Sequence, residues 1–564
     1  MGGMVDYKGR PISRSATTGG WTSALFIIGV ETAERFSYSG ISSNLISYLT
    51  GPLRQSTAAG AANANAWSGT ANMLPILGAV VADSWLGRYR TILLSSLLYV
   101  LGLALLTLSA ALLSLGSSDC DLSKGEISSC PPPSPFHVII FFFSLYLVAL
   151  GQGGHKPCVQ AFGADQFDDR DPSESKARSS FFNWWYVGIC LGCVAAYMVL
   201  NYIQDYVSWT VAFGLQCAAM ALALVVFMLG TKTYRHLVLD DKSPFLRIAN
   251  VYFEVFRNRK TPTTTFDEAG ETPLLHEETQ FESLDHKAEV TSVHYHVSSP
   301  SKQVDSICIN SLTEEEVKGL VGLVPIWLTC LIYGIVFAQT QTLFTKQGNT
   351  MERDMGFGYQ IPAASLQLFS SIVVVVFVPI YDLVLVPIGR MFAGNPSGIT
   401  MLQRIGIGMV LSAASMVSAG LVEMKRLKTA RDFGLVDMPN LPLPMSIWWL
   451  VPQYVVFGFS EVFIMIGMQE FFYDQMPCEL RSVALALYLS VSGIGSFVSS
   501  FLISMIDSFT AKRGESWFAN NINRAHLDYF FWLLAGLNFA GCLAYFYFAK
   551  SYIYKKFRGE VLPM

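Results

Sequence analysis

Stretches of about 20 mainly apolar residues recur along this chain, and no other feature limits its fold so strongly. A helix needs about 20 such residues to cross the hydrocarbon core of a bilayer. We count twelve of these stretches, six before residue 231 and six after residue 315. The chain is therefore predicted to be an all-α membrane protein with twelve transmembrane helices in two six-helix bundles. The predicted helices cover residues 21–48, 67–85, 91–113, 136–162, 180–202, 209–230, 319–344, 361–388, 402–423, 445–473, 482–506 and 527–550.

The composition supports this reading and excludes other classes of protein. Charged residues make up 14% of the 564 residues, whereas an ordinary soluble protein has about 25%. A surface so poor in charge is expected to face the lipid bilayer. The net charge of −4 gives no basic excess, so we expect no nucleic acid partner. Neither HExxH nor Gly-x-Ser-x-Gly occurs, and we expect no enzyme activity.

A long polar segment separates the two sets of apolar stretches. We interpret residues 231–315 as a flexible cytosolic linker between a first bundle, 21–230, and a second bundle, 316–550. Short cytosolic tails, 1–20 and 551–564, are expected at the ends. Six helices, a linker and six helices are the layout of the major facilitator fold, in which substrate binds near the midplane between the halves.

Basic residues in short loops predict which side faces the cytosol. The N-terminal tail, the turn at 88–90, the loop at 170–178 and the C-terminal tail carry them on one side, so both termini are predicted to be cytosolic. The bias is modest, because the loop expected after residue 423 is also basic. Its basic residues are Lys425, Arg426, Lys428 and Arg431.

Two further features of this layout stay open. No address signal separates the plasma membrane from the vacuolar membrane. Cys120 and Cys130 are predicted to lie on the non-cytosolic side. A disulfide and two free thiols are equally compatible with that position.

The first apolar stretch contains three charged residues, Glu31, Glu34 and Arg35. Their spacing of i, i+3 and i+4 places all three on one face of a helix. Charges in a membrane helix are costly unless they are paired or reached by water, so this face is expected to line a cavity. Arg35 and desolvation act in opposite directions on the carboxyl groups, which is typical of a proton-coupling site. A static ion cluster that holds helices together is the alternative.

One charge in each half is flanked by apolar sequence, Lys156 in the fourth stretch and Glu461 in the tenth. We predict that they form an ion pair between the halves, which protonation or substrate would break. Both residues are therefore candidates for gating and for substrate binding. The alternative is that each charge reaches the membrane surface from a helix end.

The segment GAVVADSWLGRYRT closes the second stretch and is predicted to be a cytosolic gating hinge. Asp83 and Arg88 are its candidate gating residues. Thr91 follows Arg88 at a spacing that basophilic kinases accept, but we interpret it as a packing residue first. A kinase acting at Thr91 or in the linker is the corresponding partner prediction.

Taken together, these motifs resemble the proton-coupled oligopeptide transporter family, and in particular its plant nitrate and peptide transporter branch. The resemblance rests on ETAERFSYSG, GAVVADSWLGRYRT, GQGGHKP, FFNWWY, GFSEVF and EFFYDQMP. It implies a major facilitator fold, alternating access and symport with protons. It also implies coupling by Glu31, Glu34 and Arg35, and substrate binding and gating by Lys156 and Glu461. In peptide carriers of the family, the matching Arg and Lys hold a substrate carboxylate and the matching Glu meets an amino group.

Three positions depart from the family pattern. Ser39 stands where the family usually has a second tyrosine after Tyr38, and Cys190 stands where it often has asparagine. Phe337 precedes Ala338-Gln339, where a nitrate carrier of the family has histidine. Since Phe337 cannot meet an anion with a charge, the change lowers the case for nitrate without removing it. We include Arg35, Tyr38, Phe337 and Gln339 with Lys156 and Glu461 in the predicted substrate site.

The predicted function is proton-coupled symport of a small anionic or zwitterionic solute, either nitrate or di- and tripeptides. A carrier of a larger plant metabolite or hormone and a non-transporting receptor of the same fold are the alternatives. The expected partners are this solute, protons and the lipid bilayer, with the proton gradient as energy source and no cofactor. His294 and His296 are too few to predict a metal site.

Overall fold

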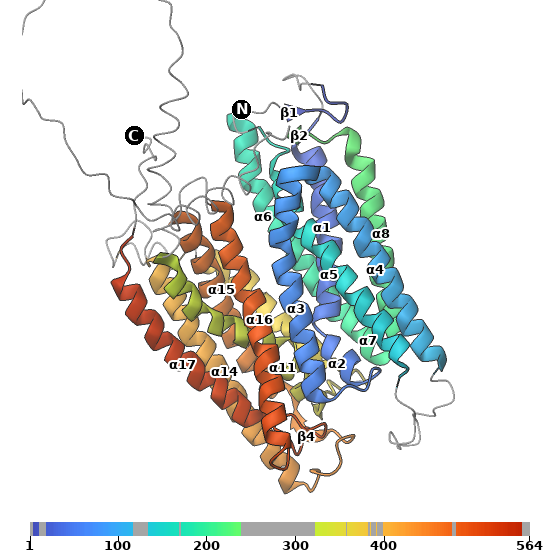
Figure 1. Ribbon diagram of the computed structural model, residues 1–564, viewed down its shortest axis with the longest axis vertical. Helices are drawn as coiled ribbons and strands as arrows, with labels where there is room; N and C mark the ends of the chain where they lie inside the picture. The colour runs from blue at the N-terminus through green and yellow to red at the C-terminus, as the bar shows by residue number, and fades with distance from the viewer. Residues whose placement is uncertain are drawn as a thin grey trace, which may run out of the picture.

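The structure is a computed structural model, and it shows two helical bundles that lean against each other (Figure 1). It describes residues 4–10, 18–116, 133–168, 171–237, 322–356, 358–381, 384, 391, 399–475 and 481–554. The first bundle contains α1 (Gly20–Ser42), α2 (Leu45–Thr50), α3 (Thr57–Val81), α4 (Arg88–Gly116), α5 (Pro135–Ala164), α6 (Pro172–Ala195), α7 (Asn201–Tyr206) and α8 (Trp209–Leu229).

The second bundle begins with a helical span over Gly322–Asn349, whose last part is α11 (Leu343–Asn349). It continues with α12 (Gln367–Ile380), α14 (Met401–Asp432), α15 (Val451–Asp474), α16 (Arg481–Ala511) and α17 (Leu527–Ser551). The 3-10 helices η6 (Ala363–Leu366) and η8 (Ile447–Leu450) precede α12 and α15, and η5 (Gly230–Lys232) follows α8 of the first bundle.

The predicted twelve-helix architecture is confirmed. Ten helices in the described part of the chain are long and apolar enough to cross a membrane. α1 and α3 complete the twelve; α1 carries three buried charges, and α3 is rich in small and polar residues. A π-helical turn, η1 (Ala82–Leu86), follows α3, and another, η4 (Ala196–Leu200), lies between α6 and α7. Such turns release a backbone carbonyl from the regular helix pattern.

Helix ends differ from the predicted ends where a helix continues beyond the apolar stretch. α14 extends to Asp432, so the basic residues expected in a loop after residue 423 lie on the last turns of this helix. The loop prediction for Lys425, Arg426, Lys428 and Arg431 is therefore wrong. α3 begins at Thr57 instead of residue 67, because an Ala- and Asn-rich segment continues the helix without strong hydropathy.

Two short two-stranded sheets lie at opposite ends of the molecule (Figure 1). β1 (Met4–Val5) pairs in antiparallel fashion with β2 (His236–Leu237), and both strands belong to the first half. β3 (Met351–Glu352) pairs in parallel fashion with β4 (Leu443–Ser446) in the second half. We call the two ends of the molecule the β1–β2 end and the β3–β4 end.

The two bundles meet along α3 and α16. A side chain at Gly69 on α3 would place its Cβ 3.0 Å from the carbonyl oxygen of Gly493, so the helices approach closely here because both residues are glycine. Deeper in this contact, Asn65 and Gln339 both donate hydrogen bonds to Ser499 Oγ, at 3.0 and 2.7 Å. All three polar side chains are buried, and they connect the halves through α16.

Further hydrogen bonds between the halves gather at the β3–β4 end. Lys346 Nζ donates to Thr50 Oγ1 at 2.9 Å, and Asn349 Nδ2 donates to Ser47 Oγ at 3.1 Å. Ser365 Oγ donates to the carbonyl oxygen of Tyr197 at 2.5 Å, and Tyr197 lies in the π-helical turn η4. The apolar core of the second bundle also extends onto residues of α2 and α3, namely Ile46, Ala58, Ala61 and Ala62. The halves are thus closed against each other at this end.

Candidate functional site

The three charges of α1 point into the first bundle. Glu31 and Glu34 are 1% and 0% exposed, and Arg35 is 8% exposed. Arg35 Nε lies 3.1 Å from Glu31 Oε1, and Arg35 Nη2 lies 2.5 Å from Glu34 Oε2. The predicted shared face is therefore confirmed. One guanidinium holds one oxygen of each carboxylate, while Glu31 Oε2 and Glu34 Oε1 have no hydrogen-bond partner in the described structure.

Close helix packing holds this cluster in place. α1 packs against α5, α6 and α8. A Cβ at Gly192 of α6 would lie 2.4 Å from the carbonyl oxygen of Thr32 and 2.9 Å from Cβ of Arg35. Only glycine fits at this position, and it lets the α6 backbone cover the back of Arg35. The guanidinium also lies over the ring of Tyr38, with Cζ 5.6 Å from the ring centroid.

Lys156 from α5 adds a second positive charge beside the carboxylates of α1. It lies close enough to act electrostatically on both Glu31 and Glu34. Among the described residues it forms no ion pair. With both carboxylates ionised, the two negative charges of Glu31 and Glu34 balance the two positive charges of Arg35 and Lys156. The cluster is neutral as a whole, although its pairing is incomplete.

Glu461 from α15 lies among tyrosines of both halves. Its charge acts on Tyr186 and Tyr197 of the first bundle and on Tyr333 and Tyr488 of the second. It also lacks an ion-pair partner in the part of the chain that the structure describes. The predicted ion pair between Lys156 and Glu461 is therefore absent from this conformation. The physical reason is that Lys156 lies with the carboxylates of its own half.

The remaining predicted substrate residues differ in their surroundings. Tyr38 is buried and stacks on Trp67, with ring centroids 5.6 Å apart. Phe337 packs against Phe457 with ring centroids 6.1 Å apart, and Phe457 stacks on Tyr333 near Glu461. Gln339 uses its amide nitrogen on Ser499 and on the carbonyl oxygen of its own helix. The structure thus gives Gln339 a role in joining helices, whereas Tyr38 and Phe337 lie beside the buried charges.

Two departures from the family pattern have clear places. Ser39 Oγ donates a hydrogen bond to Cys193 Sγ at 3.2 Å, so the small hydroxyl packs between α1 and α6. Cys190 is half-buried one turn earlier on α6 and lies beside Tyr186. Neither residue supplies the tyrosine ring or the amide that the family pattern has there.

The predicted hinge residues have separate positions. Arg88 Nη1 pairs with Asp165 Oδ2 at 2.6 Å, which joins the start of α4 to the end of α5. The side chain of Asp83 lies outside the described part, as do Cys120, Cys130, His294 and His296. Thr91 is 3% exposed, and its hydroxyl donates to the carbonyl oxygen of Gly87 at 2.9 Å. The packing interpretation of Thr91 fits this geometry, and a kinase could not reach the hydroxyl in this conformation.

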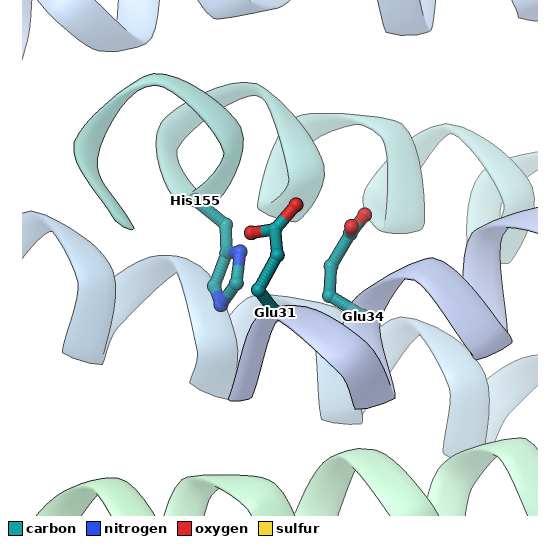
Figure 2. Close-up of side chains that lie close together, drawn as sticks. All are labelled: Glu31, Glu34 and His155. Atoms are coloured by element: carbon teal, nitrogen blue, oxygen red, sulfur yellow. The ribbon is translucent and has the colours of Figure 1, made fainter. Parts of the chain in front are cut away.

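His155, which lies directly before Lys156, was not among the predicted site residues. Figure 2 shows His155 of α5 facing the carboxylates of Glu31 and Glu34. One ligand atom from each of these residues lies within 4.8 Å of the others. The available signal was a titratable ring inside an apolar helix, next to a lysine that was already a candidate.

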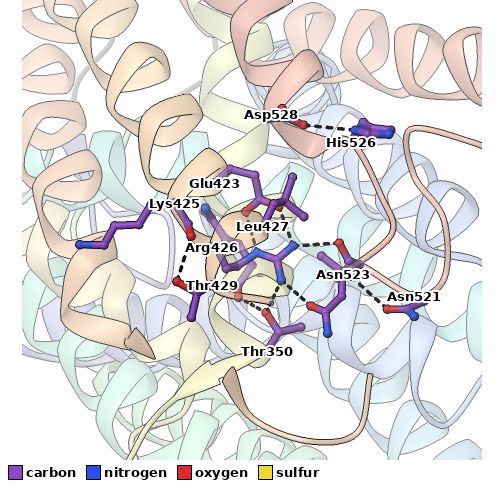
Figure 3. Close-up of polar contacts among 12 residues, drawn as sticks. Thr350, Glu423, Lys425, Arg426, Leu427, Thr429, Asn521, Asn523, His526 and Asp528 are labelled. Atoms are coloured by element: carbon purple, nitrogen blue, oxygen red, sulfur yellow. Dashed lines mark hydrogen bonds and ion pairs between the residues drawn. The ribbon is translucent and has the colours of Figure 1, made fainter. Parts of the chain in front are cut away.

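The second bundle contains another buried ion pair, and its surroundings differ (Figure 3). Arg426 and Glu423 of α14 are both 0% exposed and pair in bidentate geometry, at 2.6 and 2.8 Å. The remaining donors of Arg426 reach Thr350 Oγ1, Asn523 Oδ1 and the carbonyl oxygen of Ile522. This pair is fully satisfied and ties the loop before α17 to α14. It has the geometry of a structural ion pair, unlike the cluster on α1.

Two six-helix bundles in contact, with incompletely paired charges buried in the first half and the half-buried Glu461 in the second, define a multi-pass membrane transporter. The chain belongs to the POT family, since residues 89–522 match the PTR2 family model, described as "POT family". The expectation that it is not an enzyme is confirmed by this membership.

Curated relatives cover nearly the whole chain. Protein NRT1/ PTR FAMILY 5.10 of Arabidopsis thaliana is 58% identical over 557 residues, which are 98% of this chain and 96% of the relative. Protein NRT1/ PTR FAMILY 5.13 of the same plant is 52% identical over 556 residues, with the same coverage of 98% and 96%. The plant nitrate and peptide transporter branch named by the sequence motifs is thus confirmed as the group of similar proteins.

Solved structures show the same fold at low identity. An auto inhibited POT family peptide transporter aligns with a TM-score of 0.67 at 21% identity, covering 96% of this chain and 99% of that one. The POT family transporter PepTSo aligns with a TM-score of 0.67 at 20% identity, covering 94% and 98%. These likenesses confirm the architecture of the two bundles.

Proposed function

We propose that this protein is a proton-coupled symporter of a small zwitterionic or anionic solute, which it moves by alternating access. The observation that carries the proposal is the buried cluster of Glu31, Glu34 and Arg35 with Lys156 beside it. Buried charges that are only partly paired are poor stabilisers, so a purely structural role does not account for them. Charges that change their ion-pair partners during a transport cycle are expected to be only partly paired in any one conformation.

Charge balance explains how a proton and a solute would be coupled. The charges of Glu31, Glu34, Arg35 and Lys156 sum to zero, so one added proton leaves this cluster with a net positive charge. In a low-dielectric environment that excess favours binding of an anionic group near Arg35 and Lys156. Either ligand alone unbalances the cluster, whereas both together restore neutrality. Symport follows from this cost of unbalanced charge.

Glu461 favours a zwitterionic solute over nitrate. An unpaired carboxylate surrounded by tyrosine rings suits a protonated amine, through ion pairing and through contact with the ring faces. A solute with a carboxylate and an amine could then span Lys156 and Glu461, one in each half. Nitrate has no cationic group for Glu461, and it remains the second candidate because Arg35 and Lys156 can bind any small anion.

Several details of the proposal concern the membrane. The termini are proposed to be cytosolic, in the plasma membrane or the vacuolar membrane. In that orientation the β3–β4 end faces away from the cytosol and is closed in this structure. Separation of Lys346 from Thr50, and of Asn349 from Ser47, would be needed to open it.

The test is voltage-clamped uptake in a heterologous membrane at acidic and neutral external pH. A panel of dipeptides, nitrate and a bulkier glycoside are offered separately, and surface delivery is measured for each variant. We expect an inward current that depends on a dipeptide and grows as external pH falls. Glu34→Gln and Lys156→Ala should abolish this current.

Lys428→Ala is the matched control, because Lys428 is an exposed lysine on α14 far from the cluster. It should conduct like the wild type. A current with nitrate and none with any dipeptide would show that the substrate is nitrate and not a dipeptide. Normal currents in Glu34→Gln and Lys156→Ala would refute the coupling site, and silence of delivered protein with every solute would favour a receptor of the same fold.

A further inference from the structure

His155 is a buried imidazole that the proposed coupling scheme does not yet use. It is 0% exposed, and neither ring nitrogen has a hydrogen-bond partner among the described residues. A neutral imidazole carries one donor and one acceptor, and burial of both without partners is costly. Such a group is expected to gain a partner in another state of the protein.

Unpartnered carboxylate oxygens lie close to this ring. Glu31 Oε2 and Glu34 Oε1 are buried and also lack hydrogen bonds. Each of these two residues offers a carboxylate oxygen within 4.8 Å of a ring nitrogen of His155. Figure 2 shows that the ring and the carboxylates face one another across the contact between α1 and α5. A small shift of either helix would bring donor and acceptor into hydrogen-bond distance.

The surrounding charges decide which cation this group of three can hold. Two carboxylates and a histidine are common ligands of divalent metals. Here, however, Arg35 already contacts both carboxylates, and Lys156 adds a second positive charge. A divalent ion would leave four positive charges against two negative ones in a buried site. A proton adds only one charge and needs no space beyond a hydrogen bond.

We propose that His155 is a third proton-accepting group of the Glu31–Glu34 cluster and exchanges the transported proton with Glu31. In this step the O–H bond of the Glu31 carboxylic acid breaks and an N–H bond forms on the imidazole. The electron pair of the broken bond stays on the carboxylate, which then pairs fully with Arg35. The reverse transfer returns the proton to Glu31. The inference rests on the proposed proton coupling.

Other titratable and charged groups face the cluster from the helices packed around it. They are Arg35 and Tyr38 from α1, Tyr99 from α4, Lys156 from α5 and Cys193 from α6. α3 contributes no titratable side chain, since its sequence over Thr57–Val81 contains none. The two cations oppose a positive charge on His155. The ionised Glu34, and Glu31 once it has given up its proton, offset this opposition. A bound anionic solute would favour the transfer further.

The experiment is an infrared pH titration of the purified full-length protein in lipid nanodiscs, without any solute. It follows the carbonyl band of buried carboxylic acids. The band that is missing in Glu31→Gln is assigned to Glu31. In His155→Gln the side chain still donates and accepts hydrogen bonds but cannot take a proton. We expect the midpoint of the Glu31 band to shift by about one pH unit or more, as for strongly coupled groups.

His137→Gln is the matched control, because His137 lies near the opposite end of the same helix. The midpoint of the Glu31 band in His137→Gln should equal the midpoint in the wild type. An unchanged midpoint in His155→Gln, in protein with a wild-type unfolding temperature, would overturn the proposal. If His155→Gln does not fold, ring-labelled histidine in the wild-type protein provides the second measurement. A buried ring that stays neutral throughout the titration would also overturn it.

The outcome separates this inference from the proposed symport. A shifted midpoint together with a pH-independent substrate current would refute proton coupling and keep His155 as a partner of Glu31. A proton-dependent current with an unchanged midpoint would keep symport and remove His155 from it.

Discussion

Arg35 and Arg426 are both buried arginines, but only one of them has all its donors satisfied. Arg426 makes two hydrogen bonds to Glu423 and three to other acceptors. Arg35 instead divides its guanidinium between two carboxylates that each keep a free oxygen. Full satisfaction indicates a fixed structural contact, whereas free buried oxygens indicate a contact that changes.

The first prediction concerns Glu423. Replacement by leucine leaves the charge of Arg426 buried without its partner, and we expect a loss of about 3–5 kcal/mol in the free energy of unfolding. The double variant Glu423→Leu with Arg426→Leu should recover part of that loss, because neither charge is then stranded. Denaturant unfolding of detergent-purified protein measures both. Lys428→Ala should change stability by less than about 0.5 kcal/mol, and equal losses in the single and double variants would contradict the explanation.

The residues of the site were predictable to different degrees. The spacing of Glu31, Glu34 and Arg35 was enough to place them on one face, because helix geometry is local. The separation of Lys156 from Glu461 could not be predicted, since it depends on how the two halves are positioned in one conformation. His155 was missed because a histidine in an apolar helix resembles an ordinary core residue until its neighbours from α1 are known.

At the scale of elements, the twelve helices were predictable because each must bury about 20 apolar residues in lipid. The polar extensions of these helices were not predictable. The last turns of α14 and the first turns of α3 lie outside any apolar stretch, and only packing against the rest of the fold keeps them helical. The pairing of β1 with β2 joins residues more than 200 positions apart, for which two-residue strands leave no sequence signal.

The second prediction concerns the contact that holds the start of β2 to α6. Arg235 pairs with both oxygens of Glu174, at 2.7 and 3.1 Å, on the side of the molecule where β1 and β2 lie. The hydrogen bonds from Arg235 hold the pKa of Glu174 below its usual value. A carboxyl with a lowered pKa in the folded state contributes stability above its unfolded pKa. That contribution is lost as the pH falls through the folded pKa.

We therefore expect Glu174→Gln to lower the unfolding temperature at neutral pH and to have a much smaller effect in strong acid. The difference at neutral pH should correspond to about 1 kcal/mol, since the pair is only partly buried. Thermal unfolding of both proteins across pH 3–7 tests this. A temperature difference that is constant over the whole range would show that the ion pair does not contribute.

At the scale of the whole molecule, the two halves are joined along α3 and α16 and closed at the β3–β4 end. None of these contacts between the halves could be predicted. The apolar pattern of each half is accounted for by its own helices and carries no information about the other half. The alternating-access proposal requires that the closed end opens. The hydrogen-bonded pair of Ser47 and Asn349 offers a direct way to test this.

The third prediction is that a disulfide across the closed end stops transport. Ser47→Cys combined with Asn349→Cys places two thiols where side-chain atoms now lie 3.1 Å apart. Oxidation should abolish the substrate current, and a reducing agent should restore it. Each single cysteine variant is the control and should conduct under both conditions. Full current after complete cross-linking would show that this end does not open during transport.

The short sheet of β1 and β2 also bears on how the protein is made. It brings residues 4–5 beside residues 236–237, so the first bundle begins and ends at the same place. All contacts of this sheet are therefore complete once residue 237 has left the ribosome, before any helix of the second bundle exists. We expect the first bundle to assemble in the membrane as a closed unit during synthesis, and the second bundle to fold against a finished partner.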